Sequence, residues 1–314
     1  IGFTTMPAAD IAYNSISITT GEVTVEGATG ITITIGGNPD TDFLISGGGA
    51  AFTIGTNINI TIAAGSNANI SGTLNINIGR TYNSAGLNTV TSVFGAIYNS
   101  GTFSTATAAN LLLQDFSVYT HTQDGGTIPT ATWNTSSNCN ITGLINTNIA
   151  SGDGQAFGNL TYNCAGMTGV ITMSPTVTIS GNLNISNTGS SQVEMSAGSL
   201  TVGGELNIDG MFVISGATSR SLTVNDVVFI GGSGNLNLCN GGAANIGTLN
   251  VLSHITNFGA ITESGTGKGV INFMGAANQN FNEFGAFVNN IDVNIDNAAG
   301  VTFTNTTSVS GILT

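Results

Sequence analysis

The amino-acid sequence predicts an all-β fold: a right-handed parallel β-helix (β-solenoid) with coils of about 22 residues. Three observations favour this fold. They are the composition, a repeat at the length of one coil, and the alternation of apolar and polar residues within each repeat. The right hand follows from the general rule that parallel crossovers are right-handed.

The composition favours strands and excludes several kinds of partner. Only 6% of the 314 residues are charged, and the three cations are Arg80, Arg220 and Lys268. Residues that favour helices are scarce, whereas β-branched residues are abundant. A net charge of −13 argues against nucleic acid and anionic lipid as partners. No apolar run reaches the roughly 18 residues of a spanning helix, so we expect no membrane insertion.

The repeat is clearest in the second half of the chain. Residues 177–185, 200–208 and 222–230 align at offsets of 23 and 22 residues, and partial copies stand at 69–76 and 246–251. A period near 22 without a helical pattern is typical of one coil of a parallel β-helix. The spacing is irregular over residues 1–60 and 80–130. We expect projecting loops in the second of these regions, where a binding site would be sought first.

Each copy alternates like a half-buried strand. In the first copy Val177, Ile179, Leu183 and Ile185 are expected to point inward, with Thr and Asn between them pointing outward. The corner glycine, Gly181, is explained by a turn that needs positive φ. Equivalent residues of successive coils would stack about 4.8 Å apart, where Asn and Thr form ladders and like charges repel.

A longer repeat predicts how the coils are organised. Residues 156–183 resemble residues 286–313 at an offset of about 131 residues. We expect residues 1–314 to form one continuous solenoid segment. The last coil is unfinished in comparison with its earlier copy, so the segment is expected to belong to a longer protein.

Two sequence blocks carry a family resemblance. Residues 125–143 read GGTIPTATWNTSSNCNITG and residues 155–164 read QAFGNLTYNC. They resemble a module of long, repetitive cell-surface proteins of Bacteroidota. The resemblance is best over residues 119–255 and departs at Tyr162, where that module usually has Trp. It implies type IX secretion cargo, secreted or held at the cell surface, with the outer-membrane secretion and attachment machinery as partner. Most such proteins have no assigned activity, and a few are adhesins.

The cysteines allow two interpretations. Cys139 and Cys164 lie 25 residues apart, close to one coil, so stacking would bring their Cα atoms within the range of a disulfide. Two unpaired buried thiols are the alternative. Cys239 is left over and is expected to be buried and inert.

The sequence offers few candidates for catalysis or metal binding. Asp40 and Asp42 alternate, as oxygen ligands of a calcium ion could, but solvent-facing or turn carboxylates are the ordinary interpretation. Asp292 and Asp296 share a strand parity, and no cation lies near either pair in sequence, although Arg80 could approach from another coil. We therefore expect no enzyme and no cofactor.

The remaining candidates have similarly plain alternatives. His121 and His254 lack a second ligand at metal-binding spacing and are expected to be surface or locally hydrogen-bonded residues. The aromatic residues Trp133, Tyr162 and Phe157 could form a platform for sugar rings, but packing in the core or at coil ends is the stronger interpretation.

Three functions compete. The first is a structural or adhesive extracellular solenoid, a stalk or adhesin segment on a bacterial surface that touches surface glycans. The second is a self-assembling filament or sheath subunit, whose partner would be other copies of itself. The third is a glycan-binding or glycan-cleaving β-helix.

Overall fold

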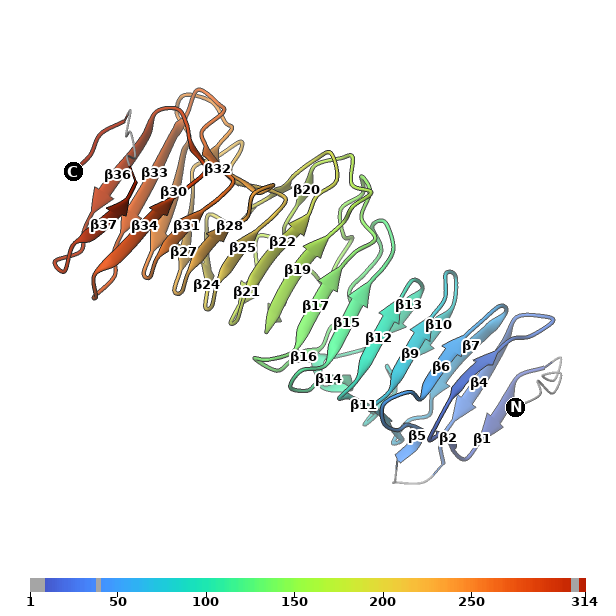
Figure 1. Ribbon diagram of the computed structural model, residues 1–314. Coiled ribbons are helices and arrows are strands. Elements are labelled where there is room, and N and C mark those ends of the chain that lie inside the picture. Colours follow the sequence, from blue (N-terminus) through green and yellow to red (C-terminus); the bar gives the residue numbers. More distant parts are fainter. Residues whose placement is uncertain (1–8, 38–40, 306–310) are drawn as a thin grey trace. The chain divides into compact units, whose positions relative to one another are not determined.

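The protein is built from short parallel strands. A computed structural model describes residues 9–37, 41–305 and 311–314 (Figure 1). A single 3-10 turn, η1 (Ala108–Asn110), is the only helical element in these ranges, and about 13 stacked coils form a β-solenoid. The predicted all-β parallel solenoid is therefore confirmed.

The chain divides into two compact units. Unit 1 comprises residues 1–143 and 149–155, and unit 2 comprises residues 144–148 and 156–314. Most coils have three strands, one on each of three faces, which we name A, B and C in unit 1 and D, E and F in unit 2. The prediction of one continuous segment stays a prediction.

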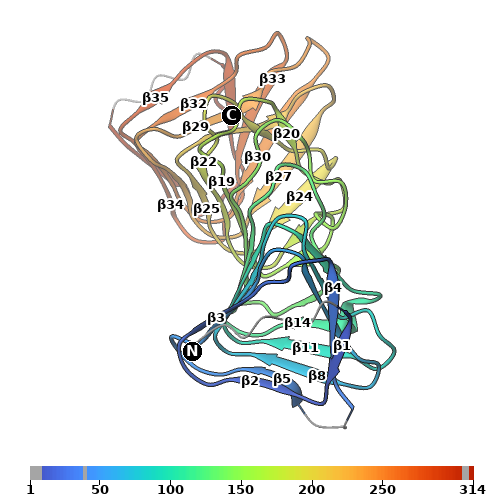
Figure 2. The same ribbon diagram turned by 90° about the vertical axis from the view of Figure 1, so that its right-hand side faces the viewer.

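In unit 1, strands of faces A and B lie on different sides of the coils (Figure 2). Face A contains β1 (Ile11–Tyr13), β4 (Ile31–Ile35), β7 (Ile58–Ile62), β10 (Thr81–Asn83) and β13 (Thr102–Ser104). Face B contains β2 (Ile16–Ile18), β5 (Thr41–Ile45), β8 (Asn67–Ile70), β11 (Val90–Val93), β14 (Leu111–Leu113) and β16 (Thr132–Trp133). Face C contains β3 (Glu22–Val25), β6 (Ala51–Ile54), β9 (Thr73–Ile76), β12 (Ala96–Asn99), β15 (Val118–His121) and β17 (Asn138–Ile141).

Unit 2 repeats the same plan. Face D contains β20 (Ile171–Thr172), β23 (Val193–Glu194), β26 (Met211–Ser215), β29 (Asn235–Cys239), β32 (Ala260–Thr262) and β35 (Ala286–Phe287). Face E contains β18 (Ala156–Phe157), β21 (Thr178–Ile179), β24 (Ser199–Val202), β27 (Arg220–Val224), β30 (Ile246–Val251), β33 (Lys268–Phe273) and β36 (Ile291–Ile295). Face F contains β19 (Asn159–Asn163), β22 (Leu183–Asn187), β25 (Leu206–Ile208), β28 (Val228–Ile230), β31 (Ile255–Asn257), β34 (Gln279–Glu283) and β37 (Val301–Thr304).

The predicted repeat register is confirmed. Leu183 stacks on Leu206 at an offset of 23 residues, and Leu200 stacks on Leu222 at an offset of 22. The side chains that were expected to point inward in the first copy are all buried, and Thr178 is exposed. Burial of these apolar rows is the main favourable term in the stability of the coils.

The two copies of the longer repeat lie on different faces. Asn159–Asn163 forms β19 on face F, whereas the aligned residues 290–294 fall in and just before β36 on face E. Residues 306–310 of the second copy are outside the described ranges. The two copies therefore share the alternation of a strand but not a place in the coil.

The corner glycine is needed for a reason other than the predicted one. Gly181 does not have a positive φ. A Cβ atom built on it would lie 2.3 Å from Oδ1 of Asn159 in the preceding coil, and one on Gly203 would lie 2.2 Å from the carbonyl oxygen of Ser180. Close approach of successive coils, not turn conformation, selects glycine at these corners.

Several other corners are fixed by side chains that point inward. Asn257 is fully buried, and its Oδ1 accepts a hydrogen bond of 3.0 Å from the amide of Gly259. Asn99 bonds the amide of Gly101 at 3.1 Å in the same way. These Asx turns satisfy backbone groups that a bend would otherwise leave unpaired.

Candidate functional site

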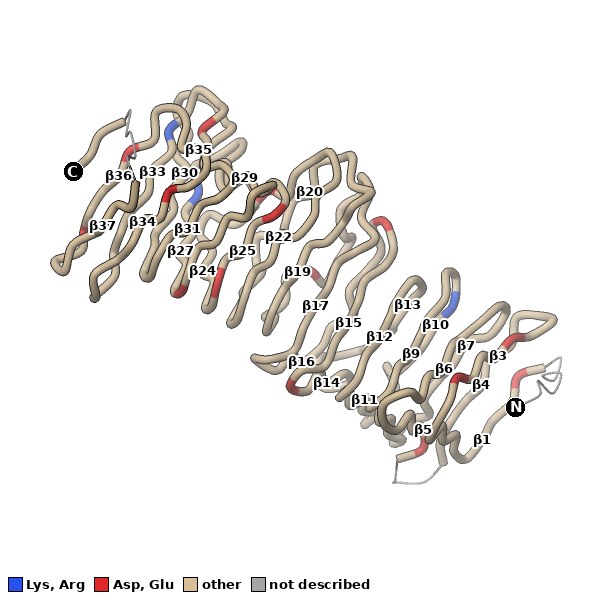
Figure 3. The backbone as a smooth tube through the Cα atoms, in the orientation of Figure 1, with Lys and Arg blue, Asp and Glu red and all other residues tan. Residues whose placement is uncertain are grey.

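Charged side chains are sparse along the described chain (Figure 3). Two ion pairs join described residues, Arg220 with Glu194 at 3.1 Å and Lys268 with Asp292. Arg80 forms no ion pair with a described carboxylate. It borders a hollow of unit 1 together with Thr56, Asn77, Ile78 and Ser100.

The predicted calcium candidates are only partly described. Asp42 is buried on β5, so the solvent-facing interpretation is wrong for this residue, and its Oδ2 has no hydrogen-bond partner among the described residues. Asp40 lies outside the described ranges. No group of three or more His, Cys, Asp or Glu side chains that could hold a metal ion occurs in the described residues. The calcium site stays a prediction.

The second carboxylate pair has a cation that the sequence did not reveal. Asp292 lies on face E beside Lys268 of the preceding coil, and its Oδ1 accepts a hydrogen bond of 2.8 Å from the amide of Ile312. Burial opposes ionisation of Asp292, but the hydrogen bonds from Lys268 and Ile312 outweigh it and lower its pKa. An ionised, ion-paired carboxylate is suited to a structural role rather than to acid catalysis.

The hydrogen bond of His121 is local, which confirms one of its two predicted interpretations, whereas that of His254 joins two successive coils. His121 is fully buried in unit 1, with 2.6 Å between its Nε2 and the carbonyl oxygen of Gly125. Burial lowers the pKa of His121, so the ring is neutral and its Nε2–H donates this bond. Nδ1 of His254 accepts a hydrogen bond of 3.0 Å from the amide of Asn280.

The aromatic candidates are core residues. Trp133, Phe157 and Tyr162 are buried. Trp133 packs edge-on against Tyr119, with ring centroids 6.0 Å apart. No open ring face is left for a sugar, so the packing interpretation is confirmed for these three residues.

All three cysteines are buried. Cys139 belongs to unit 1 and Cys164 to unit 2, and a disulfide between them stays a prediction. As a thiol, Cys139 has a pKa raised by burial, which suppresses the reactive thiolate. Cys239 lies 3.8 Å from Oγ of Ser215, inside unit 2, as expected for a buried residue.

Loops project from unit 1 within the region where they were expected. Residues 84–89 and 105–110 connect faces A and B and border a cleft. Leu87, at its rim, is 79% exposed. Asn110 holds the cleft floor by donating a hydrogen bond of 2.7 Å to the carbonyl oxygen of Thr89 and accepting one of 2.9 Å from the amide of Thr107.

One regular surface of unit 2 is a ladder of outward side chains on face E. Nδ2 of Asn250 donates to Oγ1 of Thr223 at 3.2 Å, Nδ2 of Asn272 to Oδ1 of Asn250 at 2.8 Å, and Nδ2 of Asn294 to Oδ1 of Asn272 at 2.8 Å. Oγ1 of Thr314 donates to Oδ1 of Asn294 at 2.6 Å. We name these five residues the asparagine ladder. Every donor points to the preceding coil.

Unit 1 has a different regular surface on face A. Two rows of outward residues run from coil to coil in unbroken register. We name them the threonine rows: Thr32, Asn59, Thr81 and Thr102 form one, and Thr34, Thr61, Asn83 and Ser104 form the other. None of the Thr or Ser hydroxyl groups in these rows has a hydrogen-bond partner among the described residues. All eight side chains are at least partly exposed.

No protein-family model, curated protein or solved structure matches the chain. The resemblance to Bacteroidota surface proteins therefore stays a prediction. Among the described residues no helix is long and apolar enough to cross a membrane.

Proposed function

We propose that the chain is a structural and adhesive segment of an extracellular bacterial surface protein, in which the solenoid acts as a stalk or adhesin element. The observation that carries this proposal is the asparagine ladder over a fully buried apolar core. Leu249, Ile271 and Val293 form the inward row directly beneath the ladder, and all three are buried. The ladder and the buried row beneath it make each coil stiffen the next one, as in other solenoids.

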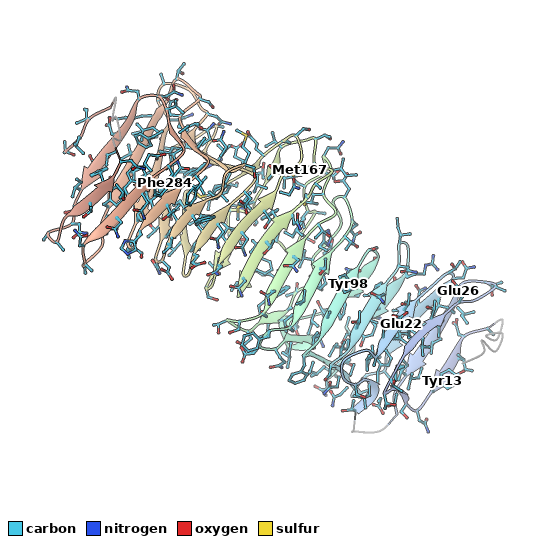
Figure 4. All side chains as sticks on the ribbon, viewed as in Figure 1. Tyr13, Glu22, Glu26, Tyr98, Met167 and Phe284 are labelled. Carbon is cyan, nitrogen blue, oxygen red and sulfur yellow. The ribbon has the colours of Figure 1, made fainter. Side chains whose placement is uncertain are left out.

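The surface chemistry supports the same proposal. Outward positions carry amides and hydroxyls rather than charges, so the faces remain compatible with stacking at about 4.8 Å. Outward side chains such as Tyr98 and Phe284 add apolar contact area (Figure 4). The resemblance to type IX secretion cargo supports a location at the cell surface.

Adhesion of beads coated with the purified chain tests this proposal. We expect retention on bacterial cells, glycan-coated glass or abiotic surfaces that exceeds retention of beads coated with an inert protein of similar charge. In parallel, immunogold electron microscopy of the parent cells should place the protein outside the outer membrane. Absence of retention on every surface, together with an internal location, contradicts the proposal. Ordered polymers of the purified chain would instead favour a filament subunit.

A further inference from the structure

Face A differs from the asparagine ladder in its unused hydrogen-bonding groups. Asn59 uses its Oδ1 for the amide of Thr81 at 2.9 Å, and Asn83 uses its Oδ1 for the amide of Ala85 at 3.0 Å. Neither amide Nδ2 has a hydrogen-bond partner in the described part of the chain. Together with the free hydroxyls of the threonine rows, they leave donors and acceptors directed at whatever lies outside the face.

The unused groups form an ordered array. The two rows are separated by two residues along each strand, about 6.6 Å, and successive coils by about 4.8 Å. The register has no bulge between β4 and β13. Directly beneath, Ile33, Ile60, Tyr82 and Phe103 are buried, and Tyr82 packs on Phe103 with ring centroids 4.8 Å apart. A packed core of this kind holds the outward side chains in fixed positions.

The chemistry of the array limits its ligand. The rows contain no charged side chain between Thr32 and Ser104, so the array itself offers no charge to an ion. Asp10 of the preceding coil, at the end of the first row, accepts a hydrogen bond of 2.7 Å from the amide of Thr32. Outward positions of β4, β7, β10 and β13 carry no aromatic ring, which disfavours stacking of a pyranose. Each Thr offers a hydroxyl that both donates and accepts, next to a methyl group. A matching ligand is uncharged, both donates and accepts hydrogen bonds, and presents these groups in an array that repeats in two directions.

We propose that face A of unit 1 binds ice. Water molecules at the surface of an ice crystal also form an array that repeats in two directions, and they are uncharged donors and acceptors. A preformed array loses little conformational entropy on binding, so many weak hydrogen bonds and methyl contacts add together. This inference does not rest on the proposed location, because it concerns a surface of the isolated chain.

The test is ice binding by the purified full chain. Thermal hysteresis and the fraction of protein incorporated into a slowly grown ice hemisphere are measured for the unmodified protein and for Thr61→Lys. Thr61 lies in the middle of its row, stacked between Thr34 and Asn83. We expect both signals in the unmodified protein and their loss in Thr61→Lys. The matched control is Thr201→Lys, an exposed outward position on face E, which should retain both signals.

A folding control separates loss of ice binding from loss of structure. The far-UV circular dichroism of every variant is compared with that of the unmodified protein, and Thr34→Lys replaces Thr61→Lys if the latter does not fold. Absence of ice binding by the folded, unmodified protein overturns the inference. Equal loss in the face A and face E variants overturns it as well. Binding to crystalline cellulose or chitin that Thr61→Lys abolishes, without binding to ice, would assign the array to a polysaccharide surface instead.

Discussion

The threonine rows of face A and the asparagine ladder of face E use the same kinds of residues but differ in what their side chains bond. In the ladder each amide spans the gap between coils, for example 2.8 Å from Nδ2 of Asn272 to Oδ1 of Asn250. Hydroxyls of successive coils can bond each other, as those of Ser100 and Thr122 do at 2.5 Å. The hydroxyls of the threonine rows bond no described residue, so they stay directed at the solvent or a ligand.

Because of this difference, the ladder is suited to stabilising the fold and the threonine rows are suited to binding a ligand. Bonds within the ladder are partly buried and contribute to the stability of unit 2. The hydroxyls of the threonine rows bond no described residue, so they contribute little to the stability of unit 1 but remain available to a ligand.

Truncation of the core should affect both units alike. Leu249→Ala beneath the ladder and Ile60→Ala beneath the rows each remove a fully buried side chain, at a cost of about 2–5 kcal/mol. Urea unfolding monitored by hydrogen exchange in each unit measures the two losses. If only one unit responded, the difference between the faces would lie in their cores and not in their outward side chains.

Removal of one outward side chain should affect the ladder far more than the rows. Asn272→Ala breaks bonds to both Asn250 and Asn294 and should cost unit 2 about 1–2 kcal/mol. Thr61→Ala breaks no bond to a described residue, so unit 1 should change by less than about 0.5 kcal/mol. Thermal unfolding of the two variants checks this contrast, and equal losses would contradict it.

Acid should weaken the ladder face. The lowered pKa of Asp292 gives stability that is fully present above its unfolded pKa, about 3.9, and is lost as the pH falls through its folded pKa. Because Lys268 is partly exposed, the contribution of the pair is less than about 1 kcal/mol. The stability of the unmodified protein minus that of Asp292→Asn, measured from pH 7 to pH 2, should therefore shrink below pH 4.

The comparison with Asp292→Asn is needed because Glu283, also in unit 2, contributes a pH dependence of stability with the opposite sign. Burial raises its pKa, against hydrogen bonds from Asn257 and Gly285, so ionisation of Glu283 reduces stability as the pH rises. Subtraction of the two curves isolates Asp292. A difference that stayed constant down to pH 2 would rule out the expected contribution of its ion pair.

The smallest expected effect is a gain in the stability of unit 1. Thr61→Asn places an amide between Thr34 and Asn83, in the arrangement that Asn184 has on Thr161 with a bond of 3.1 Å. One new partly exposed hydrogen bond should stabilise unit 1 by about 0.5 kcal/mol. Calorimetry of the variant measures the gain, and Thr61→Val serves as the control that fills the space without an amide.

The fold was predictable because its signals repeat. The alternation around Val177 and Ile179 and the offsets of 22 and 23 residues predict strand, register and burial together, and all three are confirmed. Asn99 and His121 were harder to interpret, although both occupy the inward parity of their strands. That parity was the available signal that they are buried.

The surfaces were less predictable because their bonds depend on details that alternation does not contain. Lys268 and Asp292 are distant in sequence, and only the coil register brings them together. Asn59 and Asn250 occupy similar outward positions, yet Asn59 bonds a backbone amide and Asn250 bonds Thr223 and Ser221. Which partner an Asn takes is decided by local geometry of a few tenths of an ångström.

The asparagine ladder also bears on how such a chain could change over evolution. The side chain of each rung bonds the coils next to it: among the described residues, Asn272 forms its side-chain hydrogen bonds with Asn250 and Asn294. Duplication or loss of one whole coil would rejoin the ladder with the same bonds, whereas insertion of a single residue in a strand would turn every following side chain to the opposite side. Length is therefore a trait that recombination can adjust in steps of one coil, without redesign of the parts that remain.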